Sequence, residues 1–200
     1  MFNLKKIHTI LGLILIVPLL AWAFTGLIFL IKPGYSEAYE QLSLQLYPID
    51  QHDITLPEKP WIEVRLLKTI LGHHLLVKSD NTWQHLDPIT FMPTPLPSED
   101  DQIRLLHDAV KKNSHRYGHI EKRLDNAFIT STGVSLHLNW NTLSIQQTGR
   151  DTQLINLLYK IHYLQWLGNK QANILLATAA LLILTLLVCY GLLLYIRKPC

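Results

Sequence analysis

The sequence predicts a membrane α+β protein in which two transmembrane helices flank one exported domain. Residues 7–31 and 172–196 each exceed the roughly 20 apolar residues that cross a bilayer, and neither contains Asp, Glu, Lys or Arg. Between them, alternating strand-like segments are interspersed with segments of helical period, which is typical of α+β folds. We therefore divide the chain into a tail (1–6), a first span (7–31), a folded domain (32–171), a second span (172–196) and a second tail (197–200).

Charge on the short tails predicts the orientation. Lys5 and Lys6 precede the first span, Arg197 and Lys198 follow the second, and neither tail is acidic. The positive-inside rule places both tails in the cytoplasm, which leaves the domain in the periplasm of a bacterial inner membrane. A cleaved signal peptide is the alternative for the first span, because Ala21-Trp22-Ala23 resembles a cleavage site. Apolar residues continue to Ile31, however, which favours an uncleaved anchor.

The composition of the domain excludes two function classes. Five of the 18 basic residues lie in the tails and at Lys32, whereas all 15 acidic residues lie between the spans, so the domain is slightly acidic. A nucleic-acid partner would require a basic patch, so none is expected. Both cysteines, Cys189 and Cys200, lie in or beyond the second span. The domain therefore has neither disulfides nor thiol redox chemistry.

The domain reads as two similar halves, each with strands followed by a helix. In the first half, a short helix is expected at 35–46, then strands at 61–66, 74–78 and 83–86 and a helix capped by Ser98. In the second half, strands are expected at 127–130, 135–138 and 142–145. Asp151 is expected to begin the last helix, with Arg150 as its local capping partner, and Gly168-Asn169 to end it.

The last helix carries a family resemblance. Thr148 to Asp151 leads into Leu157-Leu158-Tyr159-Lys160-Ile161-His162-Tyr163-Leu164-Gln165-Trp166-Leu167-Gly168 directly before a span, and the first span has His8-x-x-x-Gly12, Pro18, Trp22 and Thr25-Gly26. This combination resembles the PepSY-associated transmembrane family of bacterial inner-membrane proteins. Asp87-Pro88-Ile89-Thr90 resembles the hairpin end of a PepSY unit, with Phe91 where the family usually has glycine. Long members of the family have four or more spans and are linked to iron or siderophore reduction, some with haem held by histidines.

The ten histidines are candidate haem ligands, because an imidazole can hold haem iron. His162 is the first candidate, with Trp166 one helical turn away as a surface for the haem; its alternative is a hydrogen-bonded structural histidine. His8, at the cytoplasmic mouth of the first span, is the second, with anchoring among head groups as its alternative. A hydrocarbon core of about 30 Å separates the two, so they cannot ligate one iron within one chain.

Other constellations favour structural roles. His73-His74 is expected on the surface, and Gly118 between His115 and His119 favours a loop over a metal site. Glu99-Asp100-Asp101 at a helix start compensates the helix dipole. The sequence contains no zinc pattern, nucleophile elbow, phosphate loop or dinucleotide motif, so we predict no metal site and no catalytic residue.

We therefore predict a membrane-anchored binding or accessory protein that is not an enzyme and works in iron or siderophore handling, as the resemblance implies. The alternatives are a haem-bearing electron-transfer subunit of a ferric or siderophore reductase, and a regulator of an exported peptidase, which rests on family analogy alone. Small residues along the spans, such as Gly12, Ala23 and Gly26, allow close helix packing. The expected partners are the membrane and either another membrane protein or a second copy.

Overall fold

The computed structural model describes residues 4–49 and 56–196, which form two compact units. The first unit comprises the chain up to Tyr35 and from Gln153 onward, and the second comprises Ser36 to Thr152.

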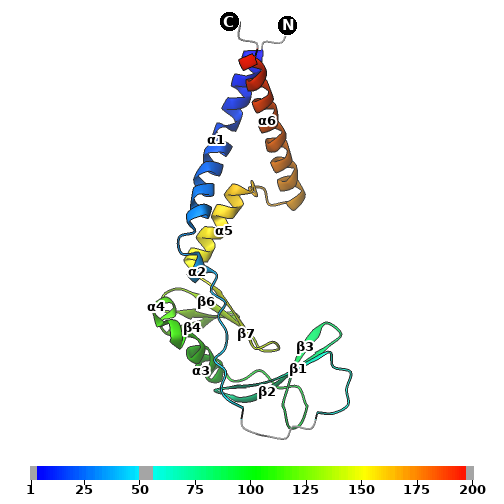
Figure 1. The fold of residues 1–200 in the computed structure, drawn as a ribbon. Coiled ribbons are helices and arrows are strands. Elements are labelled where there is room, and N and C mark those ends of the chain that lie inside the picture. Colours follow the sequence, from blue (N-terminus) through cyan, green and yellow to red (C-terminus); the bar gives the residue numbers. More distant parts are fainter. Residues whose placement is uncertain (1–3, 50–55, 197–200) are drawn as a thin grey trace. The chain divides into compact units, whose positions relative to one another are not determined.

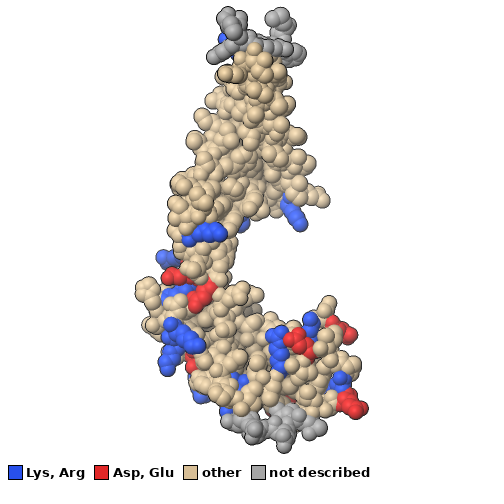
Figure 2. Space-filling model, viewed as in Figure 1, with Lys and Arg blue, Asp and Glu red and all other residues tan. Residues whose placement is uncertain are grey.

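The first unit is built on two long apolar helices, α1 (Leu4–Ile31) and α6 (Lys170–Ile196). Both are long and apolar enough to cross a membrane, and they match the predicted spans to within three residues at their starts. Figure 1 shows them closest at the Leu4 and Ile196 ends and diverging toward Ile31 and Lys170. On the face drawn in Figure 2, most of this helical pair is free of charged side chains.

Helix α5 (Arg150–His162) lies beside the Ile31 end of α1 (Figure 1) and ends earlier than predicted. Leu164 adopts a left-handed backbone with φ 53°, and the amide of Gln165 donates to the carbonyl of Lys160. This is a helix-ending motif normally associated with glycine. Asn169, expected to end this helix, instead caps α6, because its side-chain oxygen accepts from the amides of Gln171 and Ala172.

The second unit contains two antiparallel sheets, which confirms the α+β class (Figure 1). One sheet has the order β1 (Glu63–Thr69), β2 (Gly72–Ser79), β3 (Thr82–Leu86), and the other has β4 (Ile120–Leu124), β5 (Ala127–Thr130), β6 (Ser135–Asn139), β7 (Ser144–Thr148). Strand β4 was not predicted, because four of its five residues are exposed and give no alternation. The helix expected at 35–46 is only α2 (Tyr35–Ala38), after which Ser43 bridges to Ser144 of β7.

Helix α3 (Glu99–Val110) follows the first sheet and begins as predicted. The Ser98 hydroxyl accepts from the amide of Asp101. The three acidic residues occupy the first turn, where their negative charge interacts favourably with the helix dipole. A 3-10 turn, η1 (Lys111–Asn113), and the four-residue α4 (Ser114–Tyr117) connect it to β4. The main core takes side chains from α3, α4 and both sheets, including Leu76, Leu105, Leu106, Tyr117 and Leu136.

Candidate functional site

The first predicted ligand, His162, lies at the end of α5 and contacts α1. Its Nδ1 is 2.8 Å from the hydroxyl of Thr25, which is buried. The single hydroxyl proton of Thr25 is donated to the carbonyl of Ala21 at 2.6 Å, so the hydroxyl accepts from His162. His162 therefore carries its proton on Nδ1. Its Nε2 makes no hydrogen bond with any residue in 4–49 or 56–196.

Aromatic rings surround the His162 imidazole. Phe29 of α1 lies 5.1 Å away edge to face, and Tyr163 lies 5.2 Å away. Phe29 also stacks on Tyr159 of α5, with ring centroids 4.5 Å apart. The packed rings hold the Ile31 end of α1 against α5, so the imidazole is fixed in orientation.

Trp166 does not occupy the helical position that the sequence predicts for it. Because α5 ends at His162, Trp166 lies in the turn before α6 and is not one helical turn from His162. Its side chain is half exposed. Asn173 fixes the turn on both sides of Leu167, accepting from its amide and donating to its carbonyl, each at 2.8 Å. A role for Trp166 against a cofactor remains a prediction.

His8 lies near the other end of α1 and contacts α6. Its Nδ1 is 3.1 Å from the carbonyl of Leu187, which can only accept, so His8 is also protonated on Nδ1. The ring lies over Gly191, where an added Cβ would be 3.1 Å from Cε1 of His8. Along α1, His8 and Thr25 are about 25 Å apart at a helical rise of 1.5 Å per residue. This separation supports the expectation that His8 and His162 cannot share one iron within a chain.

The prediction that His73 and His74 lie on the surface is wrong for His74, which is 4% exposed on β2. Its Nδ1 is 3.0 Å from Nε2 of His85 on β3, and its Nε2 is 2.7 Å from the hydroxyl of Thr69. His85 in turn contacts the carbonyl of Trp140 through Nδ1 at 3.0 Å. The sequence signal for this buried cluster was the placement of His74 and His85 on the inward face of paired strands.

Burial changes the protonation of this pair. The pKa of His74 is lowered to about 4, mainly by burial and to a smaller extent by the neighbouring His85 and His73. Burial also lowers the pKa of His85, against the opposing effect of the bond to the Trp140 carbonyl. Both imidazoles are therefore neutral at pH 7. His115 in α4 and His119 beyond Gly118 are both exposed.

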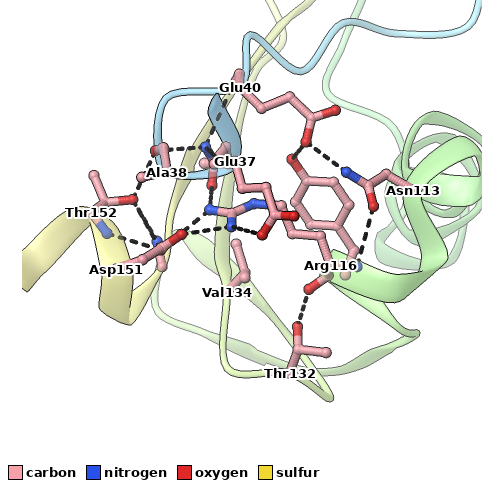
Figure 3. Close-up of polar contacts among 12 residues, drawn as sticks. Glu37, Ala38, Glu40, Asn113, Arg116, Thr132, Val134, Asp151 and Thr152 are labelled. Atoms are coloured by element: carbon pink, nitrogen blue, oxygen red, sulfur yellow. Dashed lines mark hydrogen bonds and ion pairs between the residues drawn. The ribbon is translucent and has the colours of Figure 1, made fainter. Parts of the chain in front are cut away.

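A second polar cluster centres on Arg116, whose side chain is 5% exposed (Figure 3). Its guanidinium donates to both carboxylate oxygens of Asp151, at 2.7 and 3.3 Å, and to the side-chain oxygen of Gln147 at 2.8 Å. Asp151 was expected to pair with Arg150. That expectation is wrong, because the Asp151 carboxylate points to Arg116 of α4 and Arg150 is exposed. The Arg116 hydrogen bond lowers the pKa of Asp151, so the pair is charged.

The same cluster includes the segment that follows α2. The Tyr117 hydroxyl donates to the Glu40 carboxylate at 3.0 Å, and burial together with this bond raises the pKa of Tyr117 to about 12. The Thr152 hydroxyl donates to the carbonyl of Ala38 at 2.9 Å. The side-chain amide of Gln147 donates to the carbonyls of residues 37, 38 and 40. Segments 36–40 and 151–152 are thus both bound to one cluster (Figure 3).

Across residues 4–49 and 56–196, no group of three or more His, Cys, Asp or Glu side chains is placed to hold an ion.

Two long apolar helices and an α+β domain between them define a membrane-anchored domain protein. The chain belongs to the PepSY-associated TM region family, whose model matches residues 3–198. Comparison with curated proteins and with solved structures gave no match. The family and the two apolar helices together place the protein in a membrane, and the resemblance found in the sequence is confirmed.

Proposed function

We propose that this protein is a membrane-anchored PepSY-type accessory protein that binds a partner and has no catalytic site of its own. Both tails lie in the cytoplasm and the domain faces the periplasm of a bacterial inner membrane, as the tail charges predict. The partner is a second membrane protein or a second copy of the chain.

The observation that carries this proposal is the Arg116 cluster. It binds the segment by which the chain enters the domain, through Ala38 and Glu40, and the segment by which it leaves, through Asp151 and Thr152. Most polar groups of the cluster therefore join the two connecting segments, whereas Nε of Arg116 has no hydrogen-bond partner among the described residues. Because the segments that enter and leave the domain are both hydrogen-bonded to it, the domain is suited to holding a binding surface near the membrane.

Exposed apolar side chains after β3 supply a candidate binding surface. Ile89, Met92 and Leu96 are 85%, 65% and 58% exposed, and all three lie in one stretch between β3 and α3. Contiguous exposed apolar groups are typical of protein contact sites. The turn is rigid, because the Asp87 carboxylate accepts from the amides of Ile89 and Thr90.

A variant with Ile89→Ser and Met92→Ser tests this surface. We expect the purified full chain to have a stoichiometric partner, or to self-associate by light scattering, and this association to weaken at least tenfold in the double variant. Leu124→Ser, which removes an exposed leucine from β4, is the matched control and retains the association. Equal association of the double variant and the wild type would reject the surface. A monomer with no partner would reject the accessory function.

A second candidate function, haem-dependent electron transfer for ferric or siderophore reduction, is favoured by the protonation of His162. Metal-bound histidines usually donate one ring N–H to a fixed oxygen and bind through the other nitrogen. Thr25 supplies that oxygen, and Nε2 of His162 has the lone pair. His162 would therefore hold the haem, with His8 holding a second one at the other end of α1 in the same protonation state. The haem would supply one-electron chemistry.

One absorption spectrum separates the two candidates. Full-length protein expressed with ample haem is purified in detergent beside His162→Ala and the control His115→Ala, which removes an exposed histidine. Electron transfer predicts a Soret band that His162→Ala abolishes, Thr25→Val weakens and His115→Ala retains. A colourless wild-type protein would remove the haem function, and a band that survives His162→Ala would remove His162 as its ligand.

A further inference from the structure

The histidine pair in the domain is part of a hydrogen-bonded chain whose proton positions are fixed from one end. The Trp140 carbonyl can only accept, so His85 carries its proton on Nδ1. The neutral His85 then accepts at Nε2, so His74 also carries its proton on Nδ1. His74 accepts at Nε2 from the Thr69 hydroxyl, and the Thr69 oxygen accepts from the amide of Leu71. The four donors are thus the two Nδ1–H groups, the Thr69 hydroxyl and the Leu71 amide, and each donates to one acceptor.

This series of hydrogen bonds connects the two sheets of the domain. His74 and His85 lie on β2 and β3, whereas Trp140 lies in the turn between β6 and β7. The Trp140 ring covers both imidazoles, with centroids 4.4 Å from His85 and 5.5 Å from His74. Its indole N–H donates to the carbonyl of Thr94 at 3.2 Å, which adds a second link between the β6–β7 turn and the segment after β3.

This series of hydrogen bonds can accommodate one extra proton but not two. A first proton placed on Nε2 of His74 reverses the bond to Thr69, whose oxygen has a second lone pair to accept it. A first proton on Nε2 of His85 is also accommodated, because His74 then moves its own proton to Nε2 and accepts at Nδ1; the charge in that form lies on His85. A second proton places N–H groups on both nitrogens that face each other 3.0 Å apart. Two donors cannot share that position, so the bond between His74 and His85 is lost.

Solvent reaches the hydrogen-bonded histidines through a pocket of about 400 Å³, whose lining includes His74 and Trp140. The titratable and charged groups that line the same pocket are His73, Asp87, Asp101 and Arg104. Asp87 is engaged with Ile89 and Thr90, and Asp101 with Ser98 and Arg104. Across the described residues neither carboxylate is hydrogen-bonded to either histidine, so neither compensates a charge placed on the pair.

We propose that Thr69, His74, His85 and Trp140 form an acid-sensitive latch, in which uptake of a second proton breaks the hydrogen bond between His74 and His85 and moves the Trp140 ring that packs on both imidazoles. The Trp140 carbonyl remains bonded to His85 and the indole N–H to Thr94, so the two sheets stay linked. Acidification of the surrounding compartment thereby changes the shape of the pocket that His74 and Trp140 line.

The test is an acid titration of the full chain in detergent micelles, with ¹⁵N-labelled histidine and tryptophan, followed by NMR. At pH 7 we expect both histidines to be protonated on Nδ1, with a nitrogen–nitrogen coupling across the bond that joins them. As the pH falls from 6.5 to below 4, through the pKa of His74, we expect that coupling to disappear while the Trp140 indole signal shifts. A proton on Nε2 of either histidine at pH 7, or a coupling that survives full protonation of both, would overturn the latch.

Two matched variants test the link to Trp140. His85→Asn keeps a donor for the Trp140 carbonyl but removes the nitrogen that faces His74, so the indole signal should lose its shift over this range. His137→Asn makes the same change at an exposed histidine on β6 and should keep the shift. An acid shift of the Trp140 signal that is equal in both variants would reject the proposal. If His85→Asn does not fold, the wild-type coupling decides alone.

Discussion

Arg116 of α4 and Asp151 of α5 form a two-pronged ion pair, with nitrogen–oxygen distances of 2.7 and 3.3 Å, across 35 residues of sequence. The guanidinium is almost fully buried and the carboxylate partly exposed. Because Asp151 precedes the part of α5 that belongs to the helical unit, this pair fixes the last residues of the domain onto its interior. The pair is therefore the connection on which the accessory function proposed above depends.

Removing the charge at Asp151 should destabilise the domain. Asp151→Asn leaves the buried guanidinium without its closest anionic partner, and we expect the free energy of unfolding to fall by about 1–3 kcal/mol. Urea unfolding of the full chain in detergent measures the change. Arg150→Gln, at the adjacent exposed residue, is the control and should stay within about 0.5 kcal/mol of wild type. A similar loss in both variants would mean that the pair with Arg116 is not the cause.

A second prediction concerns the turn after β3, where Phe91 has a left-handed backbone with φ 55°. The conformation explains the glycine that the family usually has there, and the Phe91 ring packs against the cluster of Leu75, Val77 and Leu86. Phe91→Ala and Phe91→Gly lose the same ring contacts, but only alanine retains the backbone strain. We expect the alanine variant to be less stable than the glycine variant by about 1 kcal/mol in urea unfolding. The usual order, with alanine the more stable, would contradict a left-handed backbone at Phe91.

The elements with strong periodicity were predictable from the sequence. The apolar runs at 7–31 and 172–196 and the Ser98 cap are local signals, and each appears in the structure close to its expected bounds. The end of α5 was not predictable, because Leu164 takes a left-handed conformation that its residue type does not favour. Packing compensates, since Leu164 is 2% exposed.

The candidate sites were harder to predict because they depend on contacts between distant segments. His162 was identified as a candidate, but its Thr25 partner lies 137 residues away and follows only from the packing of α5 on α1. His74 was expected on the surface because adjacent histidines on a strand point to opposite faces. That rule holds, yet the face that His74 points to is covered by Trp140. The alternation along a strand shows which residues share a face, but it does not show which distant segment covers that face.

Buried neutral histidines also predict how stability depends on pH. The folded-state pKa of His74 is about 4 and that of His85 is lowered, whereas unfolded histidine titrates near 6.5. Between these values the unfolded chain binds more protons, so the free energy of unfolding falls as the pH falls, by at most about 1.4 kcal/mol per pH unit for each histidine. Asp151 and Asp87, whose pKa values are lowered, contribute only below this window.

Urea midpoints measured from pH 7 to pH 4 check this slope. His74→Asn should flatten it, and His107→Asn, which removes an exposed imidazole from α3, is the matched control. A wild-type midpoint that is constant over the range would show that the pair is not held neutral.

The last prediction concerns the contact of α1 with α6. Gly191 lies against the His8 ring, and a methyl group there would press on Cε1 at 3.1 Å, whereas Gly26 has no neighbouring atom within 4 Å of an added Cβ. Gly191→Ala should therefore lower the thermal stability of the detergent-solubilised protein, because the His8 ring must shift by a few tenths of an ångström, which strains its hydrogen bond with Leu187. Gly26→Ala should be neutral or stabilising, since alanine favours a helix. In a His8→Ala background the methyl group meets no ring, and the loss caused by Gly191→Ala should disappear. An undiminished loss in that background would show that the methyl group meets a different obstacle and that His8 does not pack on Gly191.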